Sequence, residues 1–163
     1  DVYVLPNNKN IVMAAEQAAR LARTSGVRRI HVVPTTTIPQ GISAMMAYDE
    51  SAEIKDNVEA MQEAASRVQS GSVTFAARDS DYDGHQIKEG ELLALENGKV
   101  AFTGTDLGSV TAKVAKDLMQ EDSQFITLLY GADVSEEQAA DVEEAVRSLL
   151  PEEVELTLSL IHI

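Results

Sequence analysis

Two short apolar runs near the start of the chain constrain its fold most strongly. Residues 2–5 and 29–33 have the length and the β-branched composition of strands. Between them lies a helical pattern that Asn8 or Asn10 can cap, that runs to about Arg23 and that Ser25-Gly26 end. Its packing face is formed by Ile11, Ala15, Ala18, Ala19 and Ala22. Strand, helix and strand at this spacing are typical of a right-handed parallel crossover. We therefore expect the two strands to be neighbours in one sheet, with their carboxyl ends at the same edge.

A polar segment follows each of these strands, at the edge where open α/β sheets bind their ligands. We name the ten residues of these segments the polar edge and predict that they bind a partner or an anion: Asn7, Asn8, Lys9, Asn10, Thr35, Thr36, Thr37, Pro39, Gln40 and Gly41.

Each segment of the polar edge has two interpretations. An ammonium group and Asn amides beside the first helix turn suit a carboxylate or phosphate, but Lys9 can equally be a solvated side chain beside ordinary helix caps. The loop from residue 35 to 41 offers hydroxyls, an amide and a glycine for close backbone approach, while Pro34 and Pro39 restrict it. It could hydrogen-bond an oxyanion or a partner backbone, or be a stiff connector.

The rest of the chain predicts a mixed α/β fold. We expect helices over residues 42–48, 54–68 and 135–150, and another that begins at Asp106 or Ser109 and ends at Met119. Strands are expected over 73–78, 92–95, 100–102, 125–130 and 154–157. Asn97-Gly98 predicts a tight hairpin, and Ser135 to Gln138 form a capping box. The whole is interpreted as a mostly parallel sheet with flanking helices and a β-hairpin insertion, with a soft boundary near residues 69–72.

Composition narrows the possible partners. The formal net charge of −14 disfavours nucleic acid and anionic membrane surfaces, and the absence of cysteine excludes disulfides and thiolate sites. This fits a reducing cytoplasm, and no run is apolar enough for a membrane span.

No metal site and no catalytic residue are predicted. Asp79 to Gly84 reproduce the opening of an EF-hand loop, but the twelfth position is Gly90 instead of Glu and the flanks are strand-like. Gly104 to Ser109 lack a phosphate-binding lysine. His31 lies within an apolar strand, and His85 has no second histidine near it in the sequence for a zinc site.

We expect the chain to be truncated at both ends. Asp1 opens directly into a strand without an initiator methionine, and residues 158–163 resemble the translation of a transposon-derived sequencing adapter. Residues 1–157 are then the domain and 158–163 a tail, in which His162 is given no functional weight.

The polar edge in its context resembles one known family. The segments LPNNKNI (residues 5–11), AAEQA (14–18), VVPT (32–35) and TIPQG (37–41) are similar to the C-terminal domain of the catalytic component of bacterial fatty-acid kinase, which is related to dihydroxyacetone kinase. The similarity continues through Asp79, Asp83-Gly84, the Asn97-Gly98 hairpin and Tyr130-Gly131 to about residue 157.

This resemblance implies a DegV-like fold and a role without catalysis. The domain would dock an acyl-binding DegV-type partner protein, so that an upstream kinase domain, outside this chain, phosphorylates the fatty-acid carboxylate with ATP and Mg²⁺. No cofactor is then expected in the chain itself. The alternatives are an α/β domain that binds a small carboxylate, another anion or a lipid, and an autonomous enzyme.

Overall fold

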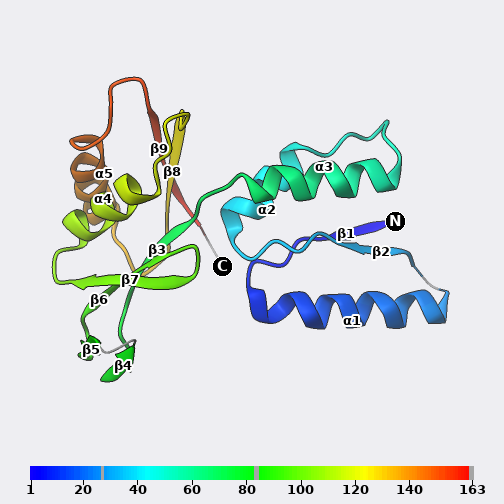
Figure 1. The fold of residues 1–163 in the computed structure, drawn as a ribbon, viewed down its shortest axis with the longest axis horizontal. Coiled ribbons are helices and arrows are strands. Elements are labelled where there is room, and N and C mark those ends of the chain that lie inside the picture. The colour runs from blue at the N-terminus through cyan, green and yellow to red at the C-terminus, as the bar shows by residue number, and fades with distance from the viewer. Residues whose placement is uncertain (27, 83–84, 162–163) are drawn as a thin grey trace. The chain divides into compact units, whose positions relative to one another are not determined.

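The computed structural model describes residues 1–26, 28–82 and 85–161, which form two compact units (Figure 1). Unit 1 is Asp1–Ser70 and unit 2 is Gly71–Ile163, so the division lies within residues 69–72. No helix among these residues is both long and apolar enough to cross a membrane. Each unit has its own core and is described separately.

Unit 1 contains the predicted parallel crossover. Strand β1 (Val2–Val4) is followed by helix α1 (Lys9–Ser25) and strand β2 (Ile30–Val32), and the strands pair in parallel with Val4 opposite Val32. Figure 1 shows α1 on one side of this pair and α3 (Ile54–Ser66) on the other. The parallel arrangement inferred from the spacing is therefore confirmed.

Local signals in the sequence set both ends of α1. The Asn8 side chain accepts a hydrogen bond of 2.9 Å from the Asn10 amide, and Gly26 ends the helix in the left-handed conformation at φ 70°. Of the five residues predicted to pack on the sheet, Ala19 is buried and Ala15 and Ala22 are half-buried, but the prediction was wrong for Ile11 and Ala18, which are exposed.

Helix α2 (Ile38–Met46) starts four residues before the predicted position. Thr37 is its N-cap and Pro39 lies in its first turn, where a proline costs no hydrogen bond because the first amides have no helical partner. The prediction of a loop from 35 to 41 was thus wrong for residues 38–41, which are helical.

The core of unit 1 lies between the strands and helices α2 and α3. Its buried members are Val33, Ala44, Met61 and Ala65, with Tyr3 and Leu5 packed against them. Asn57 is also buried, at 3% exposure, although it is a polar residue. A core with so few aromatic side chains depends on close contacts among small ones.

The first part of unit 2 is antiparallel. Strands β3 (Gly71–Phe75), β6 (Leu92–Glu96) and β7 (Lys99–Gly104) form one sheet, and β4 (Ser80–Tyr82) pairs with β5 (His85–Ile87). The Asn97-Gly98 turn is confirmed by positive φ angles of 49° and 79°. This antiparallel part is larger than a single hairpin, and the predicted strand 73–78 ends at Phe75.

The second part of unit 2 contains the other predicted strand, helix and strand unit. Strand β8 (Phe125–Tyr130), helix α5 (Glu136–Arg147) and strand β9 (Glu155–Leu160) follow in order, and the two strands are parallel. The capping box at Ser135 is confirmed, but α5 ends at Arg147 instead of Leu150. The mixed α/β fold class is therefore confirmed.

Strand β9 extends into the predicted tail. Residues 158–160 pair with residues 128–130, and the Ile161 amide donates to the Tyr130 carbonyl at 2.9 Å. His162 and Ile163 lie outside the described residues. The adapter origin of the tail stays a prediction.

Helix α4 (Leu107–Leu118) joins the two parts of unit 2. Val110 and Val114 pack with Leu92 and Ala94 of the antiparallel sheet. On another face of the helix, Ala112 packs with Val146 and Leu156 beside the parallel pair. Residues three or four positions apart share a helix face, so one helix serves both clusters.

Candidate functional site

One buried hydrogen bond ties together the two segments of the polar edge. The Thr35 hydroxyl donates to the carbonyl oxygen of Pro6 at 2.6 Å, and Thr35 is only 1% exposed. Pro6 is buried as well. The two segments therefore meet at the carboxyl edge of β1 and β2, as their positions in the sequence predict.

The first segment leaves three polar side chains facing solvent. Asn8 is occupied as the cap of α1, whereas Asn7, Lys9 and Asn10 are exposed. Within the described residues, the Lys9 ammonium group makes no ion pair, and the first turn of α1 contains no acidic residue. These three groups are available to a ligand or a partner.

The second segment uses most of its polar groups internally. The Gln40 side-chain oxygen accepts hydrogen bonds from the Thr36 amide at 2.8 Å and the Thr36 hydroxyl at 2.9 Å. The Thr37 hydroxyl caps α2 and lies 3.0 Å from the Ser70 hydroxyl. These internal bonds agree with the interpretation of this loop as a stiff connector. Within the part of the chain that the structure describes, the Gln40 side-chain nitrogen has no hydrogen-bond partner.

The structure explains the presence of a proline at position 39 but not the presence of a glycine at position 41. Pro39 suits the first turn of α2. A Cβ atom on Gly41 would lie 4.0 Å from Leu5 Cβ, which is ordinary contact. Packing within unit 1 therefore does not require glycine at position 41.

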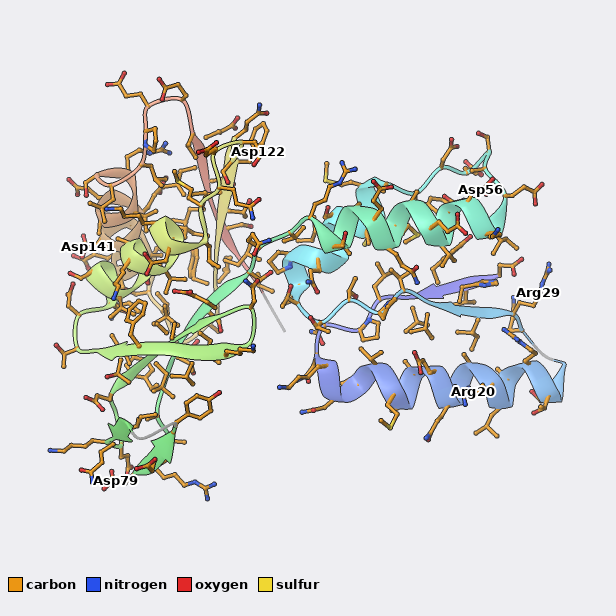
Figure 2. The ribbon with its side chains drawn as sticks, viewed as in Figure 1. Arg20, Arg29, Asp56, Asp79, Asp122 and Asp141 are labelled. Atoms are coloured by element: carbon orange, nitrogen blue, oxygen red, sulfur yellow. The ribbon has the colours of Figure 1, made fainter. Side chains whose placement is uncertain are left out.

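A second feature of unit 1 lies at the opposite, amino end of β2. An open cavity of about 610 Å³ is lined there by residues of β2, the segment before it and α3: Arg29, His31, Glu53, Ile54, Lys55, Val58, Glu59 and Gln62. Figure 2 shows Arg29 at this end of the strand pair. The sequence did not predict this cavity, because its two sides are remote along the chain.

The charges around this amino-end cavity are largely paired. Arg29 lies 3.2 Å from Asp1, and Lys55 lies 3.6 Å from Glu59. The His31 ring contacts Tyr3, and burial together with the Arg29 guanidinium lowers the pKa of His31. His31 is therefore a half-buried strand residue, in agreement with its position in an apolar run.

A smaller cavity lies between β1, α2 and α3. Its volume is about 220 Å³, and its lining is Tyr3, Leu5, Met45, Tyr48 and Met61. The Tyr3 and Tyr48 rings meet edge to face with their centroids 5.5 Å apart. No local sequence signal marks this site, because its lining comes from three separate segments.

The acidic segment from Asp79 to Gly84 in unit 2 uses its first carboxylate in a hydrogen bond to the backbone. The Asp79 carboxylate accepts a hydrogen bond of 2.7 Å from the Glu89 amide (Figure 2 labels Asp79). Strand β4 lies within this acidic segment and β5 follows it, whereas the strand predicted before the segment ends at Phe75. Asp83 and Gly84 lie outside the described residues, and no cluster of three possible metal ligands occurs among the residues described.

Solved structures share the fold of this chain. A DegV family protein of Corynebacterium glutamicum matches 98% of the chain and 68% of its own length, with a TM-score of 0.66 and 14% identity. A Thermotoga maritima protein described as revealing a fatty acid binding function matches 98% of the chain and 62% of its own length, with a TM-score of 0.57 and 18% identity. The DegV-like fold is thus established.

Relatives in sequence match almost the whole chain. Protein YloV of Bacillus subtilis is 38% identical over 96% of this chain and 28% of its own length. An uncharacterized protein of Staphylococcus haemolyticus is 40% identical over 91% of this chain and 26% of its own length. The chain therefore spans about a quarter of these relatives. The model of the FakA-like C-terminal domain family of fatty acid kinases matches residues 1–159, and the chain belongs to this family.

Proposed function

We propose that this chain is the docking domain of a fatty-acid kinase. It binds an acyl-carrying protein of the DegV type and presents it to a kinase domain elsewhere in the parent protein, which phosphorylates the fatty-acid carboxylate. ATP, Mg²⁺ and the phosphotransfer residues belong to that other domain, and the complex works in the cytoplasm. The family match and the DegV-like fold support this proposal.

The observation that carries the proposal is the geometry of the polar edge. The bond from Thr35 to Pro6 fixes two polar segments against each other, while Asn7, Lys9 and Asn10 keep exposed side chains free of internal hydrogen bonds among the described residues. A rigid framework loses little backbone entropy when a partner binds, because its loops are already ordered. The same groups suit backbone carbonyls or carboxylates of a protein surface.

The charge of Lys9 supports an acidic contact at this edge. Residues 1–48 contain five Lys and Arg against two Asp and Glu, a net charge of +3, although the chain as a whole carries −14. The remaining residues therefore carry −17. Only Lys9 of these five cations lies at the polar edge, because Arg20 and Arg23 lie at least three turns further along α1 and Arg28 and Arg29 precede the amino end of β2. The attraction of an anionic group to this edge therefore comes mainly from Lys9.

A second candidate is a site for a small carboxylate or a lipid. The apolar cavity of unit 1 favours it, together with the fold shared with the Thermotoga maritima protein. The cavity volume of about 220 Å³ is, however, below the roughly 300–1,000 Å³ of pockets that enclose whole small ligands. We therefore place protein docking first.

Calorimetric titration tests the proposal. The purified chain is titrated with the DegV-type protein of the same organism, in acyl-loaded and acyl-free forms. Saturable one-to-one binding that is weakened by Lys9→Glu supports docking at the polar edge. Absence of binding to both forms, with binding of a free carboxylate such as acetate or dodecanoate, would favour the second candidate.

A further inference from the structure

Helix α2 and the turn after it expose large apolar side chains. Met45 is 64% exposed and Met46 is 83% exposed, and Ile42 and Tyr48 are exposed as well. We call these four residues the methionine patch. Residues 30–48 contain no Asp, Glu, Lys or Arg, so no such charge interrupts the patch along the chain. Clustered exposed apolar residues of this kind mark sites of interaction in proteins.

The apolar cavity of unit 1 opens within this patch. Met45 and Tyr48 belong to the patch and also line the cavity, together with Tyr3, Leu5 and Met61. A cavity of about 220 Å³ is too small for a whole ligand of ordinary size, but it suits one large side chain. Flexible methionine side chains adapt readily to the shape of an inserted group.

Hydrogen bonds of a buried amide hold the rim of the cavity in place. Asn57, at 3% exposure, accepts from the Asp49 amide at 2.8 Å and donates to the Asp49 carbonyl at 2.7 Å. These bonds fix the turn directly after Tyr48, whose ring rests against Tyr3. The cavity is therefore formed before any partner arrives, and binding does not have to order it.

The segment beside the cavity is acidic. Asp49, Glu50 and Glu53 are exposed and follow Tyr48 closely, and no Lys or Arg occurs from residue 30 to residue 54. A partner segment that places Lys or Arg next to an apolar side chain would satisfy both the cavity and its rim. Charge complementarity of this type selects the partner and its orientation.

We propose that the cavity and the methionine patch bind one large apolar side chain of the partner protein, with a neighbouring Lys or Arg facing Asp49 and Glu50. This inference rests on the proposed docking function and gives the docking surface an apolar centre beside the polar edge. Helix α2 connects the two, because it begins at the Thr37 cap and reaches the cavity at Met45. Apolar anchors in preformed pockets carry much of the binding free energy of protein interfaces.

The methionines of the chain provide a direct test. The five methionines are Met13, Met45, Met46, Met61 and Met119. With ¹³C-labelled methionine methyl groups, titration with the purified DegV-type protein should shift the signals of Met45, Met46 and Met61. The signals of Met13 and Met119 should stay in place. Saturated binding that leaves Met45 and Met61 unshifted would overturn the proposal.

A pair of variants separates this inference from the docking function itself. Met45→Lys should weaken binding of the DegV-type protein at least tenfold. The matched control is Met13→Lys on α1, where the side chain is 68% exposed compared with 64% for Met45, and it should change the affinity less than twofold. Circular dichroism confirms that both variants are folded.

Each outcome of this comparison decides one point. If the wild-type chain binds the partner, Lys9→Glu weakens it and Met45→Lys does not, the docking function stands and the apolar anchor is refuted. If the wild-type chain does not bind, both proposals fail. If sodium dodecanoate binds in the cavity, as shown by shifts of the Met45 and Met61 methyl signals, and Met45→Lys leaves partner binding intact, the cavity is an alkyl site instead.

Discussion

The Thr35 hydroxyl and the Pro6 carbonyl oxygen are joined by a hydrogen bond of 2.6 Å between chain segments that lie 29 residues apart. Both residues are buried, so water cannot replace either partner. The bond fixes the loop after β2 to the loop after β1. The relative position of the two halves of the polar edge is thereby a property of the fold of unit 1.

Removal of this hydroxyl should destabilise unit 1. In Thr35→Val the Pro6 carbonyl keeps its burial but loses its donor, which should lower the free energy of unfolding by about 1–3 kcal/mol. Urea denaturation followed by circular dichroism measures the change. Thr36→Val is the control, because Thr36 is exposed and water can replace its bond to Gln40. Equal losses in the two variants would show that the buried bond has no special role.

Reversal of the charge at Lys9 should weaken binding of the partner protein without lowering the stability of the fold. If a charge-assisted contact is lost, Lys9→Glu should reduce the binding free energy by about 1–3 kcal/mol in calorimetric titration. A glutamate in the first turn of α1 is favoured by the helix dipole, so the unfolding temperature should stay equal or rise. Lys99→Glu, on an exposed residue of unit 2, should leave binding unchanged.

Glycine at position 71 should be required by packing. A Cβ atom there would lie 2.2 Å from Val114 Cγ1 of helix α4, so Gly71→Ala should cost about 1–3 kcal/mol through overpacking. The double variant Gly71→Ala, Val114→Ala should recover part of the loss, because it removes the clashing methyl group. Strictly additive effects of the two substitutions in denaturation experiments would contradict this explanation.

The carboxyl group of Asp106 should titrate at unusually low pH. The Ser109 hydroxyl and then the Ser109 amide donate to it, and both lower its pKa. A pKa depressed in the folded state means that the cap of α4 contributes above the unfolded-state pKa and is lost as the pH falls through the folded-state value. Carboxyl ¹³C NMR should show this shift.

The serine hydroxyl provides the control for that measurement. In Ser109→Ala the amide bond to Asp106 remains but the hydroxyl bond is gone, so the pKa of Asp106 should rise part of the way towards its ordinary value. An unchanged titration midpoint in this variant would contradict the assignment of the hydroxyl as the main cause.

Features controlled by neighbouring residues could be predicted from the sequence. Asn8, Gly26 and Ser135 end or begin helices through bonds within a few positions, and the Asn97-Gly98 turn needs only its own φ angles. The crossover in unit 1 follows from spacing and handedness alone. These predictions are confirmed because the contacts that determine them join residues close together along the chain.

Features that depend on remote contacts could not be predicted in this way. Helix α5 ends at Arg147, whose side chain donates to the carbonyl oxygens of Val154 and Leu156. A hydrophobic periodicity does not predict such contacts, because they join a polar side chain to a later segment of the backbone. The apolar cavity needs Tyr3, Met45 and Met61 to meet across three segments. The start of α2 is different, because a proline two positions after Thr37, at Pro39, is a usable sequence signal for a helix start.

Helix α4 contributes buried side chains to both hydrophobic clusters of unit 2. Unfolding of this helix would expose the antiparallel sheet and the parallel strand pair to solvent together. The two strand groups should therefore unfold cooperatively whenever α4 unfolds. Backbone amides in the centres of β6 and β8 should therefore show the same free energy of opening in hydrogen–deuterium exchange, as one cooperative block.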